Sequence, residues 1–156
     1  TSGNILDNFT VSAFTPLSDN WQLGLEAGKE AFGMSFWDID ELDNNLYKIE
    51  QNPTLMWAGL GLKYVVDKHI EFLANAQPYG HLTIASTAVG PLSKASMGLQ
   101  FVSDNGLGIL IGLEGSTLVY QNDDNWYSSQ KLGVTYGIKY IAIIINYCSC
   151  ILSVTN

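Results

Sequence analysis

Basic residues are scarce in this sequence. It contains no arginine, and its Lys and Arg total of 7 faces 15 acidic residues, which gives a net charge of -8 at pH 7. Charged residues make up 14% of the chain, against about 25% in an ordinary soluble domain. The negative charge excludes a nucleic-acid binder that relies on a basic face, because such a chain repels phosphate.

Cysteines and long apolar runs are also scarce. Cys148 and Cys150 are the only cysteines, so the body of the chain has neither a disulfide framework nor a thiolate metal site. The longest strongly apolar run lies within Tyr140–Leu152 and is too short for the ~20 residues of a membrane-spanning helix. A disordered chain is excluded as well, because 47% of the residues are hydrophobic. We expect one domain, no cofactor and no metal.

The sequence does have a strong alternation of apolar residues with a period of two, which is typical of antiparallel strands. In Trp21–Gly28, for example, Trp, Leu, Leu and Ala alternate with Gln, Gly, Glu and Gly. Ile70–Val89 is taken as one strand through Pro78, although a break at the proline would add a strand. The pattern predicts an all-β fold with these seven strands: Phe9–Thr15, Trp21–Gly28, Ala58–Tyr64, Ile70–Val89, Lys94–Phe101, Leu107–Glu114 and Lys131–Lys139.

The face opposite the apolar residues carries glycines and a few charged residues. A soluble barrel would need many charges on its outer face, whereas glycines inside a narrow barrel make room for a few large polar side chains. The pattern therefore favours a membrane β-barrel with the apolar set outside over a soluble barrel with that set inside. Both signs of charge share the glycine face, which predicts a lumen ion-pair network of Glu26, Glu71, Glu114, Lys63, Lys94, Lys131 and Lys139.

Two connections, Trp37–Pro53 and Gln121–Ser129, are longer and more polar than the others. When successive turns are assigned to opposite ends of the barrel, both fall at one end, as the longer extracellular loops of outer-membrane barrels do. The last predicted strand then ends on the periplasmic side. Seven is an odd number, however, and single-chain bacterial barrels have even numbers. We therefore expect an additional first strand before Thr1, which would give eight.

With these features the sequence resembles the small bacterial outer-membrane β-barrel proteins, the porin-like families of outer-membrane protein A, X and W type, over about Phe9–Tyr140. The most specific segment is Lys131–Ile138, which looks like the C-terminal signal that the barrel assembly machinery reads. Carried over to this chain, the signal residues are Gly133, Tyr136, Ile138 and Tyr140.

The resemblance implies an antiparallel up-and-down transmembrane β-barrel of 7–8 strands in residues 1–140, located in the bacterial outer membrane. Its implied partners are the lipid bilayer and the barrel assembly machinery. The family normally ends at an aromatic residue near Tyr140, but this chain continues to Asn156. Residues 141–156 are therefore a C-terminal extension, which is either added sequence or a strand in the place of the missing first one.

Candidate chemistry is sparse. His81 lies on the polar face with Tyr79 and Thr83, and a lone histidine there is more often hydrogen-bonded than catalytic. Some outer-membrane barrels are lipid A deacylases with a His/Ser pair, but His81 and Ser86 have opposite parity and are expected on opposite faces. The acidic run Asp38–Asp43, with Glu50 beyond it, lacks the central glycine and spacing of an EF-hand calcium loop. A solvated acidic loop is the favoured interpretation.

The function predicted from the sequence is that of a non-enzymatic outer-membrane barrel with a largely filled lumen. Its role is structural, adhesive or a narrow passage for small solutes. The alternative is a soluble β-barrel or sandwich that binds an apolar small molecule, in which Leu23, Leu60, Leu99 and Val134 would face an inner cavity. A third hypothesis is a surface enzyme that acts on lipid through His81.

Overall fold

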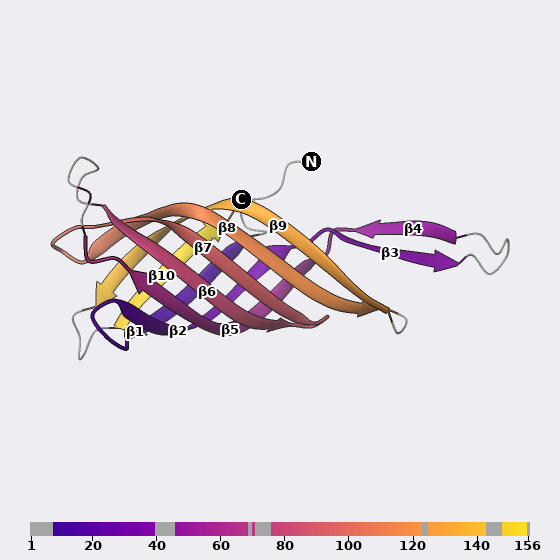
Figure 1. Cartoon of the computed structure of the whole chain (residues 1–156), viewed down its shortest axis with the longest axis horizontal. Coiled ribbons are helices and arrows are strands. Elements are labelled where there is room, and N and C mark those ends of the chain that lie inside the picture. Colours follow the sequence, from indigo (N-terminus) through magenta and orange to yellow (C-terminus); the bar gives the residue numbers. More distant parts are fainter. Residues whose placement is uncertain are drawn as a thin grey trace.

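The structure, a computed structural model, describes residues 8–39, 46–68, 70, 76–122, 125–142 and 148–155. The predicted all-β, antiparallel fold is confirmed: eight strands close into a barrel in the order β1-β10-β9-β8-β7-β6-β5-β2, and β3 pairs with β4 in a separate hairpin (Figure 1). The strands are β1 (Phe9–Pro16), β2 (Trp21–Ala31), β3 (Met34–Ile39), β4 (Leu46–Gln51), β5 (Thr54–Val65), β6 (Gln77–Thr87), β7 (Pro91–Val102), β8 (Leu107–Asn122), β9 (Asn125–Ala142) and β10 (Cys148–Thr155).

The C-terminal segment closes the barrel. Strand β10 pairs with β9 on one side, Cys150 opposite Tyr140, and with β1 on the other, Cys150 opposite Ala13. The boundary predicted after residue 140 is therefore wrong, because β9 runs to Ala142 and β10 belongs to the barrel. Of the two interpretations of the tail, the additional strand is confirmed, and closure needs no strand before Thr1.

Three other predicted boundaries differ from the structure. Strand β6 begins at Gln77, and Ile70 makes only an isolated bridge with Ala76. Pro78 is thus the second residue of a strand and lies near its start, away from the strand interior. Most of the predicted loop Trp37–Pro53 belongs to the β3–β4 hairpin. The predicted loop Gln121–Ser129 is mainly paired strand, with Gln121 opposite Trp126, because its aromatic residues continue the strands.

Successive connections lie at opposite ends of the barrel, as predicted. One end, here called the turn end, carries the short turns Leu17–Asn20 and Ser103–Gly106. Gly106 has φ 81° there, a left-handed conformation that favours glycine. The other end, the hairpin end, carries the β3–β4 hairpin and the tip of β8–β9 (Figure 1). The last predicted strand, Lys131–Lys139, ends at the turn end, as predicted. It is not the last strand of the barrel, however, because β10 follows it and returns the chain to the hairpin end.

The side chains alternate between the lumen and the outer face along each strand. The lumen contains buried polar and charged groups such as Glu26, Lys63 and Lys94. No helix in the described part of the chain is long and apolar enough to cross a membrane. The outer face is strongly apolar, and these of its residues are more than half exposed: Leu25, Met56, Leu60, Leu82, Ile84, Met97, Ile109, Leu113, Leu132 and Ile138.

Candidate functional site

Lys94 is the centre of an ion-pair cluster in the lumen. Its Nζ lies 3.0 Å from Oε2 of Glu30 and 2.9 Å from Oε1 of Glu114, so strands β7, β2 and β8 meet at one ammonium group. Lys131 Nζ lies 3.4 Å from the other oxygen of Glu30, and Ser116 Oγ donates a hydrogen bond to that oxygen at 3.1 Å. The side chain of Lys94 is only 5% exposed. The arrangement therefore compensates buried charges with opposite charges and hydrogen bonds, as a low-dielectric interior requires.

Glu26 forms a second cluster nearer the turn end. Its carboxylate accepts hydrogen bonds from Ser12 Oγ at 2.7 Å and Thr83 Oγ1 at 2.5 Å. Nε2 of His81 lies 3.1 Å from Oε2 of Glu26, and Nδ1 of the same ring lies 3.4 Å from Ser96 Oγ. Strands β1 and β6 thus supply the partners of this buried carboxylate, and Ser96 of β7 extends the network through His81.

Ser96, His81 and Glu26 are connected in the same order as a Ser-His-acid triad. The cavity beside them, which all three line, has a volume of about 30 Å³. That volume holds one or two water molecules and excludes a lipid acyl group. Ser86 lies exposed on the outer face while His81 faces inward, as their parity predicted. The geometry therefore offers a hydrogen-bond network and no access for an acyl substrate.

Lys63 and Lys139 form a third group. Both ammonium groups donate to one acceptor, Oε1 of Gln100, at 3.0 Å from Lys63 and 3.5 Å from Lys139. Lys63 Nζ also lies 4.6 Å from the centroid of the Tyr79 ring, a cation–π contact. The two lysines are 1% and 2% exposed. Two buried cations therefore share a single neutral acceptor.

Apolar clusters fill the lumen on both sides of the charged layer. One cluster lies toward the hairpin end and the other toward the turn end, and between them the charged groups leave a cavity of about 30 Å³ in the described interior. This packing agrees with the prediction of a largely filled lumen. The hairpin-end cluster contains Phe32, Trp57, Ala85, Leu92, Leu118 and Tyr120, and the turn-end cluster contains Phe14, Val65, Tyr79, Leu110 and Ile151.

Glycines on the lumen side make room for these side chains, as predicted. A Cβ on Gly61 would lie 2.6 Å from Oε2 of Glu26 and 2.9 Å from Nε2 of His81. A Cβ on Gly28 would lie 2.8 Å from the indole ring of Trp57. The glycines therefore let the wall approach the polar layer closely.

We expect Gly61→Ala to destabilise the barrel by about 1–3 kcal/mol, because the added methyl group overpacks the Glu26–His81 pair. Gly80→Ala is the matched control in the next strand, since no atom lies within 4 Å of a Cβ built there. That substitution should be neutral or stabilising by up to about 1 kcal/mol. Urea unfolding of the two variants measures both effects, and equal free energies of unfolding would contradict the packing.

The sequence placed six of its seven predicted charged residues correctly in the lumen, and Glu71 lies outside the described residues. The six do not form one network: Glu114, Lys94 and Lys131 share the cluster around Glu30, Glu26 has its own cluster, and Lys63 and Lys139 lie together. Sequence reasoning missed Glu30. It has the same parity as Glu26, so continuing the alternation beyond Gly28 would have found it.

The residues assigned to the assembly signal lie in β9. Tyr136, Ile138 and Tyr140 are exposed on the outer face, while Gly133 has the opposite parity. Strand β9 is followed by β10 in the barrel, so the predicted terminal position of this segment is wrong. The segment has the spacing of aromatic and aliphatic residues that is typical of the signal, but it does not lie in the last strand of the barrel.

The acidic segment gives no described metal site. Asp40–Asp43 lie outside the described residues, and no group of three potential ligands occurs among the residues that the structure does describe. Glu50 pairs with Lys48 at 2.6 Å on the exposed surface of β4. The hydrogen bond and the charge of Lys48 lower the pKa of Glu50 from its ordinary value.

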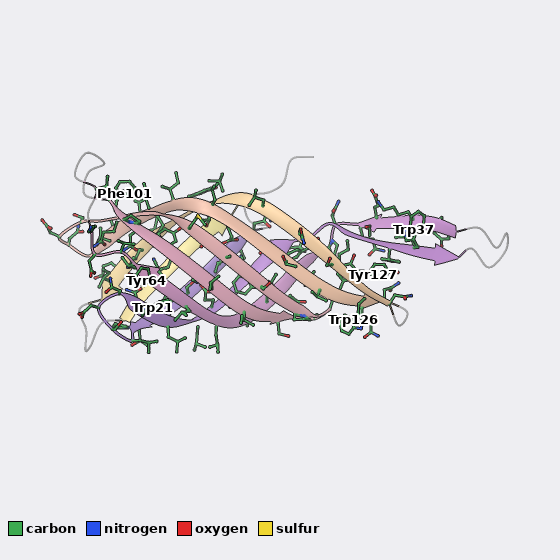
Figure 2. All side chains as sticks on the ribbon, in the orientation of Figure 1. Trp21, Trp37, Tyr64, Phe101, Trp126 and Tyr127 are labelled. Atoms are coloured by element: carbon green, nitrogen blue, oxygen red, sulfur yellow. The ribbon has the colours of Figure 1, made fainter. Side chains whose placement is uncertain are left out.

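Aromatic side chains mark both ends of the barrel. Trp21 and Tyr64 contact each other at the turn end, with ring centroids 4.8 Å apart, and Phe101 lies at the same end (Figure 2). Trp126 and Tyr127 lie at the hairpin end (Figure 2). Both groups are near strand ends, where aromatic residues are enriched in membrane barrels.

Tyr120 and Ser129 attach the β3–β4 hairpin to the barrel. Tyr120 OH accepts a hydrogen bond from the Ser35 amide and donates one to the Ser35 carbonyl oxygen, both at 3.0 Å. Ser129 Oγ donates to the carbonyl oxygen of Gly33 at 2.6 Å. The hairpin thus projects from the barrel on a hydrogen-bonded base (Figure 1).

We expect Tyr120→Phe to loosen the hairpin without opening the barrel. The ring that stacks on Tyr127 is kept, while two hydrogen bonds worth about 0.5–1.5 kcal/mol each are lost. Amide hydrogen exchange should accelerate in β3 and β4 and stay unchanged in β6 and β7. Tyr127→Phe serves as the control, and equal exchange in both variants would argue against this anchor.

No protein family, no curated protein and no solved structure matches this chain.

Proposed function

We propose that the protein is a non-enzymatic β-barrel of the bacterial outer membrane. The observation that supports this proposal is that polar and apolar side chains are distributed oppositely to those of a soluble protein. Charged side chains such as Glu30 and Lys63 are buried in the lumen, whereas large apolar side chains such as Met56 and Leu132 are exposed on the outer face. Soluble monomers rarely expose such a continuous apolar surface, and a bilayer covers it at no hydration cost.

The dimensions support the same proposal. A transmembrane β-strand needs about 9–11 residues, and β2, β5, β6 and β7 have 11, 12, 11 and 12 residues. The aromatic groups at the two ends of the barrel have the position of interfacial girdles. Strands β8 and β9, with 16 and 18 residues, are long enough to extend beyond the bilayer at the hairpin end.

The soluble alternative receives no support from the residues that were to distinguish it. Leu23, Leu60 and Val134 are 39%, 55% and 46% exposed on the outer face, and Leu99 is half-buried at the wall. None of these four residues lines the lumen cavity. Between the two apolar clusters, the charged interior has a cavity of about 30 Å³, which is too small for an apolar ligand.

The closed lumen also distinguishes between the roles of a membrane barrel. Two apolar clusters and a charged layer obstruct the described interior, so a structural or adhesive role is favoured over a solute passage. In this proposal the barrel is an anchor, and the β3–β4 hairpin is the part that it presents. Trp37 is exposed on this hairpin and is available for contact with another surface.

Folding in the presence and absence of detergent tests the proposal. Urea-denatured chain is diluted into buffer alone or into buffer with a nonionic detergent, and secondary structure and gel mobility without heating are recorded. We expect strand structure and a heat-modifiable band only with detergent. A folded monomer in buffer alone would refute the membrane proposal.

Longer loops are extracellular in outer-membrane barrels, so we propose that the hairpin end faces outward. Lys48 is exposed on this hairpin, whereas Lys63 and Lys94 are buried in the wall. Trypsin added to intact cells should therefore cleave after Lys48 and leave the barrel intact. Cleavage only after the outer membrane is permeabilised would reverse the orientation.

A further inference from the structure

Lys63 and Lys139 differ from the other two lysines of the lumen, Lys94 and Lys131. Lys94 has two carboxylates within 3.0 Å, and Lys131 has one at 3.4 Å. Lys63 and Lys139 have no carboxylate within ion-pair distance among the described residues, and both contact the neutral oxygen of Gln100. In the part of the chain that the structure describes, the positive charge of these two lysines therefore has no carboxylate partner.

Burial of two ammonium groups without a carboxylate partner costs folding free energy. Removing an ammonium group from water carries a penalty of several kcal/mol unless an opposite charge compensates it. A neutral amide oxygen compensates only in part, and here one such oxygen serves two ammonium groups. An anion close to both lysines would relieve the penalty.

A cavity gives an anion access to this pair. It has a volume of about 540 Å³, opens at the turn end of the barrel, and is lined by Lys139, Gln22, Ile141 and the Pro16–Asp19 turn. Oε1 of Gln22 is buried without a hydrogen-bond partner among the described residues. Lys139 belongs both to this cavity and to the contact with Gln100, so it links the solvent-accessible mouth to Lys63.

We propose that the turn-end mouth of the lumen binds a small phosphate-type oxyanion through Lys139, with Lys63 as the second cation. Ser18 on the rim supplies a further donor, and the Gln22 amide supplies another when its NH₂ group faces the anion. Asp19 on the same rim opposes the anion and limits its affinity. The site is inside the barrel, so it does not depend on the membrane proposal.

The experiment measures the thermal unfolding midpoint of the folded protein in nonionic detergent while sodium phosphate is titrated at constant ionic strength, held by a bulky monovalent sulfonate. Ligand that binds only the folded state raises the midpoint, and we expect a rise of ~5 °C at saturation. Broadening of the ³¹P resonance of phosphate provides a second readout that needs no unfolding.

Matched variants locate the site. Lys139→Met and Lys63→Met should abolish the phosphate-dependent rise and the line broadening, whereas Lys48→Met on the exposed hairpin should keep both. Asp19→Asn should lower the phosphate concentration at half effect by about two- to fivefold, because it removes a repulsive charge of modest, screened strength. This increase in affinity keeps the test informative if a lysine variant fails to fold.

Three results would overturn the proposal. One is a wild-type midpoint and ³¹P line width that do not respond to phosphate, and another is an equal response in Lys139→Met. The third is a response to phosphate that appears only in the Glu71→Gln variant. That result would mean that in the wild-type protein the carboxylate of Glu71 takes the place of the anion beside the two lysines. A short-chain phosphatidic acid is then added as a competitor below its micelle concentration. If it displaces phosphate, the natural source of the oxyanion is a lipid headgroup. If it does not, the natural ligand is free phosphate.

Discussion

Lys94→Met should destabilise the folded barrel by about 3–5 kcal/mol. Lys94 pairs with Glu30 at 3.0 Å and with Glu114 at 2.9 Å, and it shares Glu30 with Lys131. Its removal takes a positive charge from beside two buried carboxylates, which costs more than the ion pairs themselves contribute. Equilibrium unfolding of detergent- or lipid-folded protein in urea, followed by tryptophan fluorescence, measures the loss.

The exposed pair Lys48–Glu50 is the control for this prediction. Its atoms are 2.6 Å apart, closer than those of the Lys94 pairs, but its side chains are 47% and 70% exposed. Water already solvates both charges, so Lys48→Met should leave the unfolding midpoint unchanged. The double variant Lys94→Met with Glu114→Gln should recover part of the loss, because it also removes the charge of one of the two carboxylates that pair with Lys94. A Lys94→Met midpoint equal to that of wild type would contradict the cluster.

Leu82→Arg should have the second large effect, a loss of about 2–4 kcal/mol when the protein is folded in a bilayer. Leu82 lies at the middle of β6 and is 58% exposed on the outer face. A charged side chain at the bilayer midplane has to reach the interface or draw water into the lipid. In a soluble protein the same exposed position would change stability by less than about 0.5 kcal/mol.

A second arginine substitution, placed near the end of the barrel instead of at its middle, is the matched control for Leu82→Arg. Val102 is the last residue of β7 at the turn end and is also exposed. Val102→Arg should cost only about 0–1 kcal/mol, since the penalty falls toward the interface. Unfolding in lipid vesicles measures both variants, and equal effects at Leu82 and Val102 would argue that no hydrocarbon layer surrounds the wall.

The parts of the structure that sequence reasoning predicted correctly depend on local alternation. Because successive side chains in a strand point to opposite faces, the parity of Lys63 or Lys94 assigned each to the lumen without knowledge of the fold. The same rule separated His81 from Ser86. The glycines opposite the apolar set indicated where large lumen side chains would lie, as Gly61 beside Glu26 illustrates.

The incorrect predictions concern contacts between distant parts of the chain. Strand β10 lies in a largely apolar tail with weak alternation, and its role depends on pairing with β1, more than 130 residues earlier in sequence. The partners of Lys94 could not be predicted either: Glu30 belongs to β2, which does not neighbour β7 in the sheet. Contacts across a lumen are set by barrel closure and strand stagger, which parity does not encode.

The solvent that surrounds the outer face is tested most directly with a spin label at Met97, which is 69% exposed in the middle of β7. A single cysteine at position 97 carries the label, with Cys148 and Cys150 replaced by serine, and a label at Ser103 in the neighbouring turn is the aqueous reference. In lipid vesicles we expect the Met97 label to collide with oxygen and to be shielded from a water-soluble nickel complex, while the Ser103 label shows the opposite. Equal access of the nickel complex to both labels in the folded protein would contradict a membrane-embedded barrel.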